Sequence, residues 1–260
     1  MSDQEILLRQ DNFGVARLVL NRPAARNSLS MPLMAALQDT LDGIKADPAV
    51  RVVVIAANGP AFCAGHDLKE IRAEPQKAAY ERLLATCSRL MTSIVRLPQP
   101  VIAEVQGIAT AAGCQLVATA DLAVAADTVR FATPGVNIGL FCSTPMVALS
   151  RNVARKHAME MLLTGDMIDC DTALRFGLIN RAVDPAELTD TVMALARQIA
   201  TKSKVPLAIG KEAFYRQLEG GLDAAYAYAS EAMTRNLMAG DAAEGIDAFI
   251  EKRQPVWQDD

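Results

Sequence analysis

Short apolar runs alternate with helical patterns along the first half of this 260-residue chain, and this alternation constrains the fold most strongly. Four runs are short, rich in β-branched or other apolar residues and bounded by turn formers, and they cover residues 15–20, 50–57, 101–105 and 122–126. Continuous apolar runs of this length are typical of buried strands. The pattern predicts an α/β fold in which helices cover a buried sheet.

Two helices are expected between these strands. Ser30 can cap the first helix, which has Pro32 near its first turn. Its apolar positions repeat at helical spacing and comprise Leu33, Leu37, Leu41 and Ile44. The second helix is expected over residues 76–96, because Pro98 follows and cannot continue a helix.

Helical patterns dominate the second half of the chain. They cover residues 156–163, 171–176, 185–203, 205–218, 222–238 and 242–252. No Gly/Ser-rich or Pro-rich linker precedes the last sixty residues. We therefore expect a single α/β core over residues 1–200 with a helical extension over residues 201–260.

The distribution of charge excludes several classes of partner. The chain has 26 Lys and Arg residues against 30 Asp and Glu residues, a formal charge of −4, and no basic run with interleaved aromatic residues. This argues against a nucleic-acid partner. Residues 105–120 and 131–150 contain no Asp, Glu, Lys, Arg or His, but their glycines, prolines and amides do not suit a membrane span.

The start of the chain and its cysteines favour a cytoplasmic protein. The first ten residues contain no basic segment followed by an apolar one, as a secretory signal would. Five cysteines form no CxxC pair, which fits reduced thiols. His66 and His157 are the two histidines and no acidic ligands cluster with them, so no metal site is expected.

Two segments share one local design, in which a strand leads through a glycine-containing turn into a helix. The first runs through Asn58-Gly59-Pro60 into residues 62–70, and the second runs through Gln106-Gly107 into residues 111–116. Helix N-termini carry unpaired N–H groups and a partial positive charge. Two such turns facing one pocket would form an oxyanion hole, whereas either turn alone could serve only backbone geometry.

Several short motifs in a fixed order resemble one known family. They are residues 21–29, residues 62–70, residues 100–103 with 107–115, residues 121–125, residues 163–165, and Ala173 with residues 177–179. Over essentially its whole length the chain resembles the crotonase superfamily, also called the enoyl-CoA hydratase/isomerase family. The resemblance implies a spiral of β-β-α units that forms two nearly perpendicular sheets.

The resemblance also implies an acyl thioester of coenzyme A as the substrate, with no separate cofactor. The backbone N–H groups of His66 and Ala112 match the family's donors to the thioester carbonyl, which would stabilise an enolate. The side chains expected to line this site are Ala64, His66, Asp67, Leu68, Lys69 and Ala112. The C-terminal helices are expected to pack on the core and on neighbouring subunits of a homotrimer or homohexamer.

Three basic residues are candidates for the phosphates of coenzyme A, because an acidic protein must concentrate positive charge locally to bind a polyanion. They are Arg22, Arg26 and Lys211. Surface charge without a ligand is the alternative for each of them.

The sequence departs from the family's hydratases at two positions. Hydration uses two glutamates, and the motifs place Gln115 and Gly135 where these acids belong. The family label is enoyl-CoA hydratase, yet neither residue can act as a base. Two alternatives remain: a decarboxylase of the methylmalonyl-CoA type, in which loss of CO₂ forms the enolate without a base, and an acyl-CoA-binding or assembly protein without turnover.

Three other residues could replace the missing acids. Ser143 lies where dehalogenase relatives place a nucleophilic carboxylate, and Cys114 and Cys142 are possible thiol nucleophiles. The two cysteines fit small core residues better, because apolar surroundings raise a thiol pKa.

Overall fold

A large sheet runs through the core of the computed structural model, which describes residues 5–260. Its order is β1-β2-β3-β5-β7-β10, with β1 and β2 antiparallel and all other neighbours parallel. These strands are β1 (Leu7–Asn12), β2 (Val15–Leu20), β3 (Val52–Ala57), β5 (Val101–Val105), β7 (Leu122–Ala126) and β10 (Arg181–Val183). Strands β3 and β5 are buried throughout, as their apolar runs predict.

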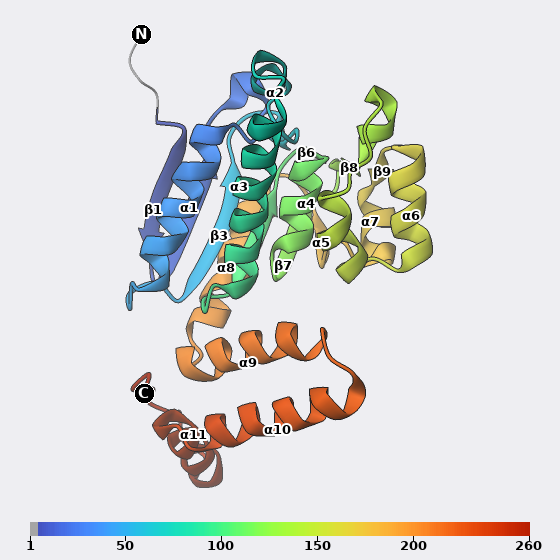
Figure 1. Cartoon of the computed structure of the whole chain (residues 1–260). Coiled ribbons are helices and arrows are strands. Elements are labelled where there is room, and N and C mark those ends of the chain that lie inside the picture. The colour runs from blue at the N-terminus through green and yellow to red at the C-terminus, as the bar shows by residue number, and fades with distance from the viewer. Residues whose placement is uncertain (1–4) are drawn as a thin grey trace.

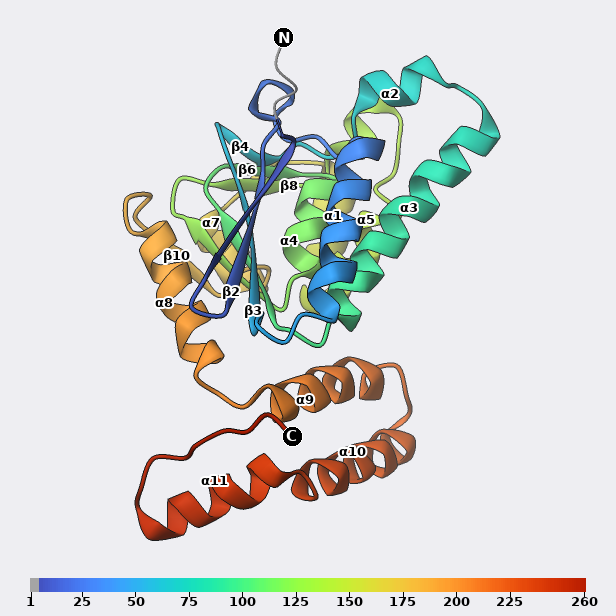
Figure 2. The same cartoon turned by 90° about the vertical axis from the view of Figure 1, so that its left-hand side faces the viewer.

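A smaller sheet has the order β4-β6-β8-β9. Its strands are β4 (Ala61–Cys63), β6 (Ile108–Thr110), β8 (Arg130–Ala132) and β9 (Ile168–Asp169). Figure 2 shows these strands running across those of the large sheet. The chain places β3, β5 and β7 in the large sheet and the strand that follows each of them in the small one, so each turn of the spiral serves both sheets.

Helices cover the sheets and confirm the α/β class. They are α1 (Met31–Lys45), α2 (Leu68–Ala73), α3 (Lys77–Arg96), α4 (Ala112–Thr119), α5 (Pro145–Asn152), α6 (Arg155–Thr164), α7 (Cys170–Phe176) and α8 (Leu188–Ala200), with 3₁₀ turns η1 (Pro23–Ala25) and η2 (Pro134–Ile138). Ser30 Oγ accepts the Leu33 N–H at 3.3 Å and caps α1, as predicted. Helix α8 begins later than expected because Asp184 accepts the Ala186 and Glu187 N–H groups in a turn.

The last three helices lie beneath the core as a separate layer, which we call the helical arm (residues 201–260) (Figure 1). They are α9 (Lys204–Gln217), α10 (Leu222–Leu237) and α11 (Gly240–Glu251). Polar contacts join α9 to the core: Lys211 Nζ lies 2.6 Å from Asp121 Oδ2, and the Tyr215 hydroxyl donates to Asp121 Oδ1 at 2.8 Å. The arm is thus held at the lower edge of the core by charge and hydrogen bonds.

The sequence analysis missed the shortest strands and the first one. Strands β4, β6, β8 and β10 have three residues each and β9 has two, which is too short for a periodic pattern. Strand β1 is an edge strand in which only Leu7 is buried, so it does not read as an apolar run. Residues 1–4, part of the segment behind the targeting prediction, lie outside the described residues. From residue 5 onward, the structure contains no helix with the length and apolar character of a membrane span.

Candidate functional site

The two glycine-containing turns lie directly against each other. An ideal Cβ on Gly113 would overlap the carbonyl oxygen of Cys63, and one on Gly65 would lie 2.9 Å from Ala111 Cβ and 3.4 Å from Ala112 N. Real Cβ atoms do not approach so closely, and Gly65 also has a φ of +96° that favours glycine. These glycines therefore serve the close approach of two backbones, which brings residues 63–66 beside residues 111–113.

The N–H of His66 takes no part in the bridge between this turn and Leu29. His66 forms a parallel bridge with Leu29, in which the Leu29 N–H donates to Gly65 O at 2.8 Å and the Asp67 N–H donates to Leu29 O at 3.4 Å. These bonds use the residues on either side of His66. Because N–H groups alternate along an extended chain, that of His66 points away from Leu29 and is left free by this bridge.

The N–H of Ala112 is the first donor of helix α4 and has no partner within that helix. The preceding residue, Ala111, holds φ +51° and ψ −119°, a conformation that is strained for a residue with a side chain. Strain of this kind costs about 1–3 kcal/mol and persists only where the surroundings impose it. It turns the start of α4, and its positive end, toward Gly65.

The ring nitrogens of the half-buried His66 are shielded from solvent, and the backbone of Leu29 lies beside the ring. Neither ring nitrogen has a hydrogen-bond partner within the described part of the chain. Burial lowers the pKa of this imidazole, so the neutral ring is favoured.

The predicted residues Asp67 and Arg22 lie close together and bind each other. Arg22 Nη2 donates to Asp67 Oδ2 at 3.1 Å, while Asp67 Oδ1 accepts the Lys69 N–H at 3.1 Å and caps α2. Partial burial acts to raise the pKa of Asp67, but the bonds from Arg22 and from the Lys69 N–H outweigh it and the pKa lies below its usual value. Sequence spacing gave no sign of this pair.

The other predicted ligands of coenzyme A fall into two groups. Arg26, Leu68 and Lys69 are exposed at the rim of the first turn, and the Ala64 N–H donates to Arg26 O at 3.1 Å. Lys211 lies elsewhere, in the arm, where its ammonium donates to Ile94 O and Gln99 O at 3.0 Å and its side chain is 7% exposed. Its charge is committed to Asp121, so the structure does not bring Lys211 to the site.

Gln115 and Gly135, which the motif resemblance places at the positions of the two hydratase acids, are buried. Gln115 Oε1 lies 4.0 Å from Cys87 Sγ of α3. A Cβ on Gly135 would lie 2.9 Å from both Cys142 Sγ and Leu140 O. The segment after η2 therefore fills the volume that an acidic side chain at position 135 would occupy.

The candidate nucleophiles do not form an activated group. Burial raises the pKa of Cys114 to about 12 and also raises that of Cys142. The Ser143 hydroxyl is directed to Phe141 O at 3.4 Å. Both thiols are buried, which fits the expected role as small core residues.

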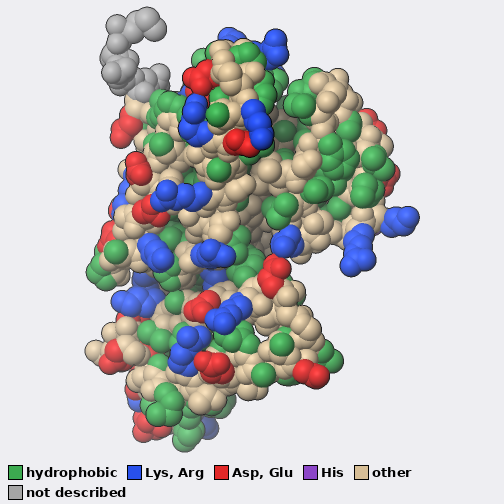
Figure 3. All heavy atoms as spheres, viewed as in Figure 1, with side chains coloured by type: hydrophobic (Ala, Val, Ile, Leu, Met, Phe, Trp, Pro, Cys, Tyr) green, Lys and Arg blue, Asp and Glu red, His purple; other side chains and the backbone are tan. Residues whose placement is uncertain are grey.

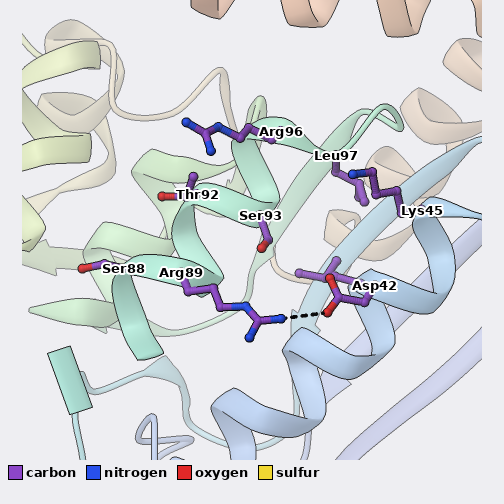
Figure 4. Close-up of a pocket in the computed structure, with 9 residues that line it drawn as sticks. Asp42, Lys45, Ser88, Arg89, Thr92, Ser93, Arg96 and Leu97 are labelled. Carbon is purple, nitrogen blue, oxygen red and sulfur yellow. Dashed lines mark hydrogen bonds and ion pairs between the residues drawn. The ribbon is translucent and has the colours of Figure 1, made fainter. Parts of the chain in front are cut away.

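A groove of about 420 Å³ lies between α1 and α3, away from both turns (Figure 4). Arg89 points across it toward Asp42, at 3.3 Å, and Lys45 and Arg96 lie near its other end. Because the groove begins at Leu41 on α1 whereas Ser30, near the turns, caps the start of this helix, about 16 Å of helix separates the groove from the site. Among residues 5–260, no group of three or more His, Cys, Asp or Glu residues is placed to hold a metal ion.

Comparison with known proteins identifies the family. A model of the enoyl-CoA hydratase/isomerase family matches residues 10–260. This chain belongs to the enoyl-CoA hydratase/isomerase family. The crotonase resemblance and the fold that it implies are therefore confirmed.

Individual members of the family are highly similar to this chain. The chain is 49% identical over 248 residues to the mitochondrial enoyl-CoA hydratase domain-containing protein 3 of Xenopus laevis, covering 95% of this chain and 84% of that protein. A crystal structure of an enoyl-CoA hydratase from Mycobacterium smegmatis is 53% identical, with a TM-score of 0.96 and coverage of 98% and 99%. That of human enoyl coenzyme A hydratase domain-containing protein 3 is 46% identical, with a TM-score of 0.94 and coverage of 97% and 100%.

These comparisons refine one sequence prediction and overturn another. The likeness to the domain-containing protein 3 type agrees with two stretches of sequence, residues 62–70 and residues 141–145. The prediction of a cytoplasmic protein is contradicted, because the Xenopus laevis, Rattus norvegicus and Homo sapiens relatives are named as mitochondrial proteins. That prediction rested on the first residues, whereas the compartment is not encoded in the fold that these proteins share.

Proposed function

We propose that this protein binds an acyl thioester of coenzyme A and stabilises the thioester enolate with the N–H groups of His66 and Ala112. The observation that supports the proposal is the close contact of Gly65 and Gly113 with the opposite turn, which brings the two turns that carry these donors together. Preorganised donors are worth about 3–4 kcal/mol each when negative charge develops on the bound oxygen. Family membership supports the same chemistry.

Coenzyme A would enter this site as part of the substrate, so no further cofactor is proposed. Arg26 and Lys69, which are exposed beside the first turn, are the cations best placed to meet its phosphates. Arg22 and Asp67 are bound to each other and would support the turn rather than contact the ligand.

The reaction that we propose does not use two glutamates. Gln115 and Gly135 cannot activate water, and the volume beside Gly135 is taken by Cys142 and Leu140. Loss of CO₂ from a substrate such as methylmalonyl-CoA forms the enolate without a base, so it requires only the oxyanion donors and a site for the leaving carboxylate. The lack of an acid at positions 115 and 135 favours a decarboxylase over the nominal hydratase.

Two assays separate the candidate functions. The purified protein would be incubated with crotonyl-CoA and with methylmalonyl-CoA, and calorimetry would measure the binding of each. Release of CO₂ from methylmalonyl-CoA is the expected result, and hydration of crotonyl-CoA at ordinary hydratase rates would contradict the argument from Gln115 and Gly135. Binding of both thioesters without conversion would identify a non-catalytic acyl-CoA-binding protein.

We further propose that the chain assembles as a homotrimer or a homohexamer. Large apolar side chains of the arm are exposed, among them Phe249 at 85% and Leu222 at 74%. A second apolar surface includes Ile138, Leu140 and Leu163, and Figure 3 shows hydrophobic side chains gathered on the side where Figure 1 places α6 and α7. Exposed apolar surfaces of this kind mark subunit contacts. Light scattering should report three or six subunits, and a stable monomer would contradict this proposal.

A further inference from the structure

The Arg22 guanidinium joins the segment after β2 to the turn that carries His66. Its Nη1 donates to Ser28 O at 2.7 Å, and its Nη2 donates to Asp67 Oδ2 at 3.1 Å. Both ends of the ion pair are shielded, since the Arg22 side chain is 22% exposed and that of Asp67 is 14% exposed. A pair with this burial is less screened than one on the open surface.

Asp67 is fully engaged by its neighbours. Besides the bond from Arg22, Asp67 Oδ2 accepts the Ser28 hydroxyl at 3.3 Å and Oδ1 accepts the Lys69 N–H at 3.1 Å. Its own N–H donates to Leu29 O. The residue that follows His66 is therefore fixed through both its backbone and its side chain.

We propose that Arg22 is a positioning residue, which acts through Asp67 to fix the direction of the His66 N–H in the thioester site. The peptide of His66 is held on one side by Gly65, whose carbonyl binds Leu29, and on the other by Asp67. An oxyanion donor must lie about 2.7–3.1 Å from the charge it stabilises, and a displacement of about 1 Å is enough to cost a large part of its effect. Without Arg22, Asp67 keeps its hydrogen bonds with Leu29, Ser28, Lys69 and Ile71 but loses its ion pair, which is the charged contact that ties its side chain to the segment after β2.

The choice of arginine follows from its geometry. The guanidinium reaches two acceptors in different directions, a carbonyl on residues 22–29 and a carboxylate on the turn. The single ammonium of lysine cannot hold both acceptors with the same spacing. Lys at position 22 should therefore preserve the charge but only part of the alignment.

This inference rests on the proposed function. It can be tested with an optical probe, which reports polarisation of the bound carbonyl without any reaction product. The probe is a cinnamoyl-CoA derivative with a conjugated amino group, whose absorption moves to longer wavelength when donors polarise its carbonyl. Binding affinity and wavelength shift would be measured for the unchanged protein and for Arg22→Met, Arg22→Lys and Asp67→Asn. Arg89→Met is the matched control, since it breaks an exposed ion pair with Asp42 in the remote groove.

We expect Arg22→Met to bind the probe but to lose about half or more of the red shift, since one of two donors is misdirected. Arg22→Lys should recover part of the shift, and Arg89→Met should keep all of it. An unchanged shift in both Arg22→Met and Asp67→Asn would overturn the inference. Asp67→Asn keeps the shape and the capping oxygen of the side chain, so it remains a test should Arg22→Met fail to fold.

Failure of the proposed function would look different. In that case the unchanged protein alone would give the answer: it would bind the probe without a wavelength shift, or it would not bind the probe at all. That outcome overturns the oxyanion site itself and, with it, the role of Arg22.

Discussion

Cys142 Sγ lies 2.9 Å from the point that the Cβ of a side chain at Gly135 would occupy. The contact belongs to a closed segment, because the Leu140 N–H donates to Gly135 O at 2.9 Å and Gly139 turns the chain back with a φ of +78°. Position 135, where the motif resemblance predicts an acid in the family's hydratases, thus lies against the protein's own backbone and a thiol.

We expect Gly135→Glu, alone or combined with Gln115→Glu, not to create hydration of crotonyl-CoA. The new Cβ would meet Cys142 Sγ and Leu140 O, and overpacking of this kind costs about 1–3 kcal/mol of stability. Chemical denaturation would measure the loss, and a spectrophotometric assay would measure hydration.

The companion variant Gly135→Glu with Cys142→Ala removes the thiol but leaves the Leu140 carbonyl at 2.9 Å. It should recover part of the stability and still show no hydration. A double variant Gln115→Glu with Gly135→Glu that is as stable as the unchanged protein and hydrates crotonyl-CoA would show that the segment after η2 opens readily.

Helices and strands that produce a pattern within a few neighbouring residues could be predicted from the sequence. The buried strands β3 and β5 and the capped helix α1 lie close to where their apolar patterns place them, because burial and capping act within a few residues. The shared design of the two turns is also local, so both turns could be predicted from the sequence. The lack of ionisable residues in the segments around Gln115 and Gly135 can likewise be seen in the sequence without a structure.

Contacts between segments that are far apart in the sequence could not be predicted from any pattern of neighbouring residues. Arg22 and Asp67 are 45 residues apart, and each alone resembles a surface charge available to a phosphate. Lys211 meets Asp121 only because α9 packs under the core, which no periodicity specifies. For this reason the sequence led to the prediction that Arg22 and Lys211 bind the phosphates of coenzyme A, whereas in the structure they pair with Asp67 and Asp121.

Gly113→Ala should separate the two turns. Its Cβ would overlap the Cys63 carbonyl, which is backbone and cannot move aside as a side chain can. We expect a loss of about 3 kcal/mol or more in the free energy of unfolding and no measurable binding of an acyl-CoA. Denaturation and calorimetry would measure the two effects.

Gly43→Ala in α1 is the matched control, because nothing lies within 4 Å of the added Cβ. It should stabilise the protein by about 0.4–1 kcal/mol, since alanine is the better helix former. If Gly113→Ala behaved like Gly43→Ala, the close approach of the two turns would not be needed for folding or for binding.

Lys211→Met should weaken the fold without weakening the binding of acyl-CoA. Removing the ammonium leaves the Asp121 carboxylate with the Tyr215 hydroxyl and the Val101 N–H, and breaking a buried ion pair costs about 3–5 kcal/mol. Lys45→Met, an exposed lysine at the end of α1, should leave stability within about 0.5 kcal/mol. A tenfold or larger loss of affinity for acyl-CoA in a folded Lys211→Met protein would show that Lys211 contributes to binding after all.

Asp259 should make the attachment of the arm depend on pH. Its carboxylate pairs with Arg51 Nη1 at 2.6 Å and accepts the Lys204 N–H at 3.0 Å, so that the last residues of the arm bind both the core and the start of α9. The bonds from Arg51 hold the pKa of Asp259 below its ordinary value.

A carboxyl with a lowered folded-state pKa stabilises the fold above its unfolded-state pKa, and this contribution is lost as the pH falls toward the folded-state pKa. The free energy of unfolding should therefore exceed that of Asp259→Asn at neutral pH, and the difference should shrink as the pH falls below about 5. Asp247→Asn, an exposed carboxyl of α11, is the control and should show no such difference. Suppose instead that the plots of unfolding free energy against pH stay parallel for Asp259→Asn and the unchanged protein down to about pH 3. The charge of Asp259 would then not help to attach the arm.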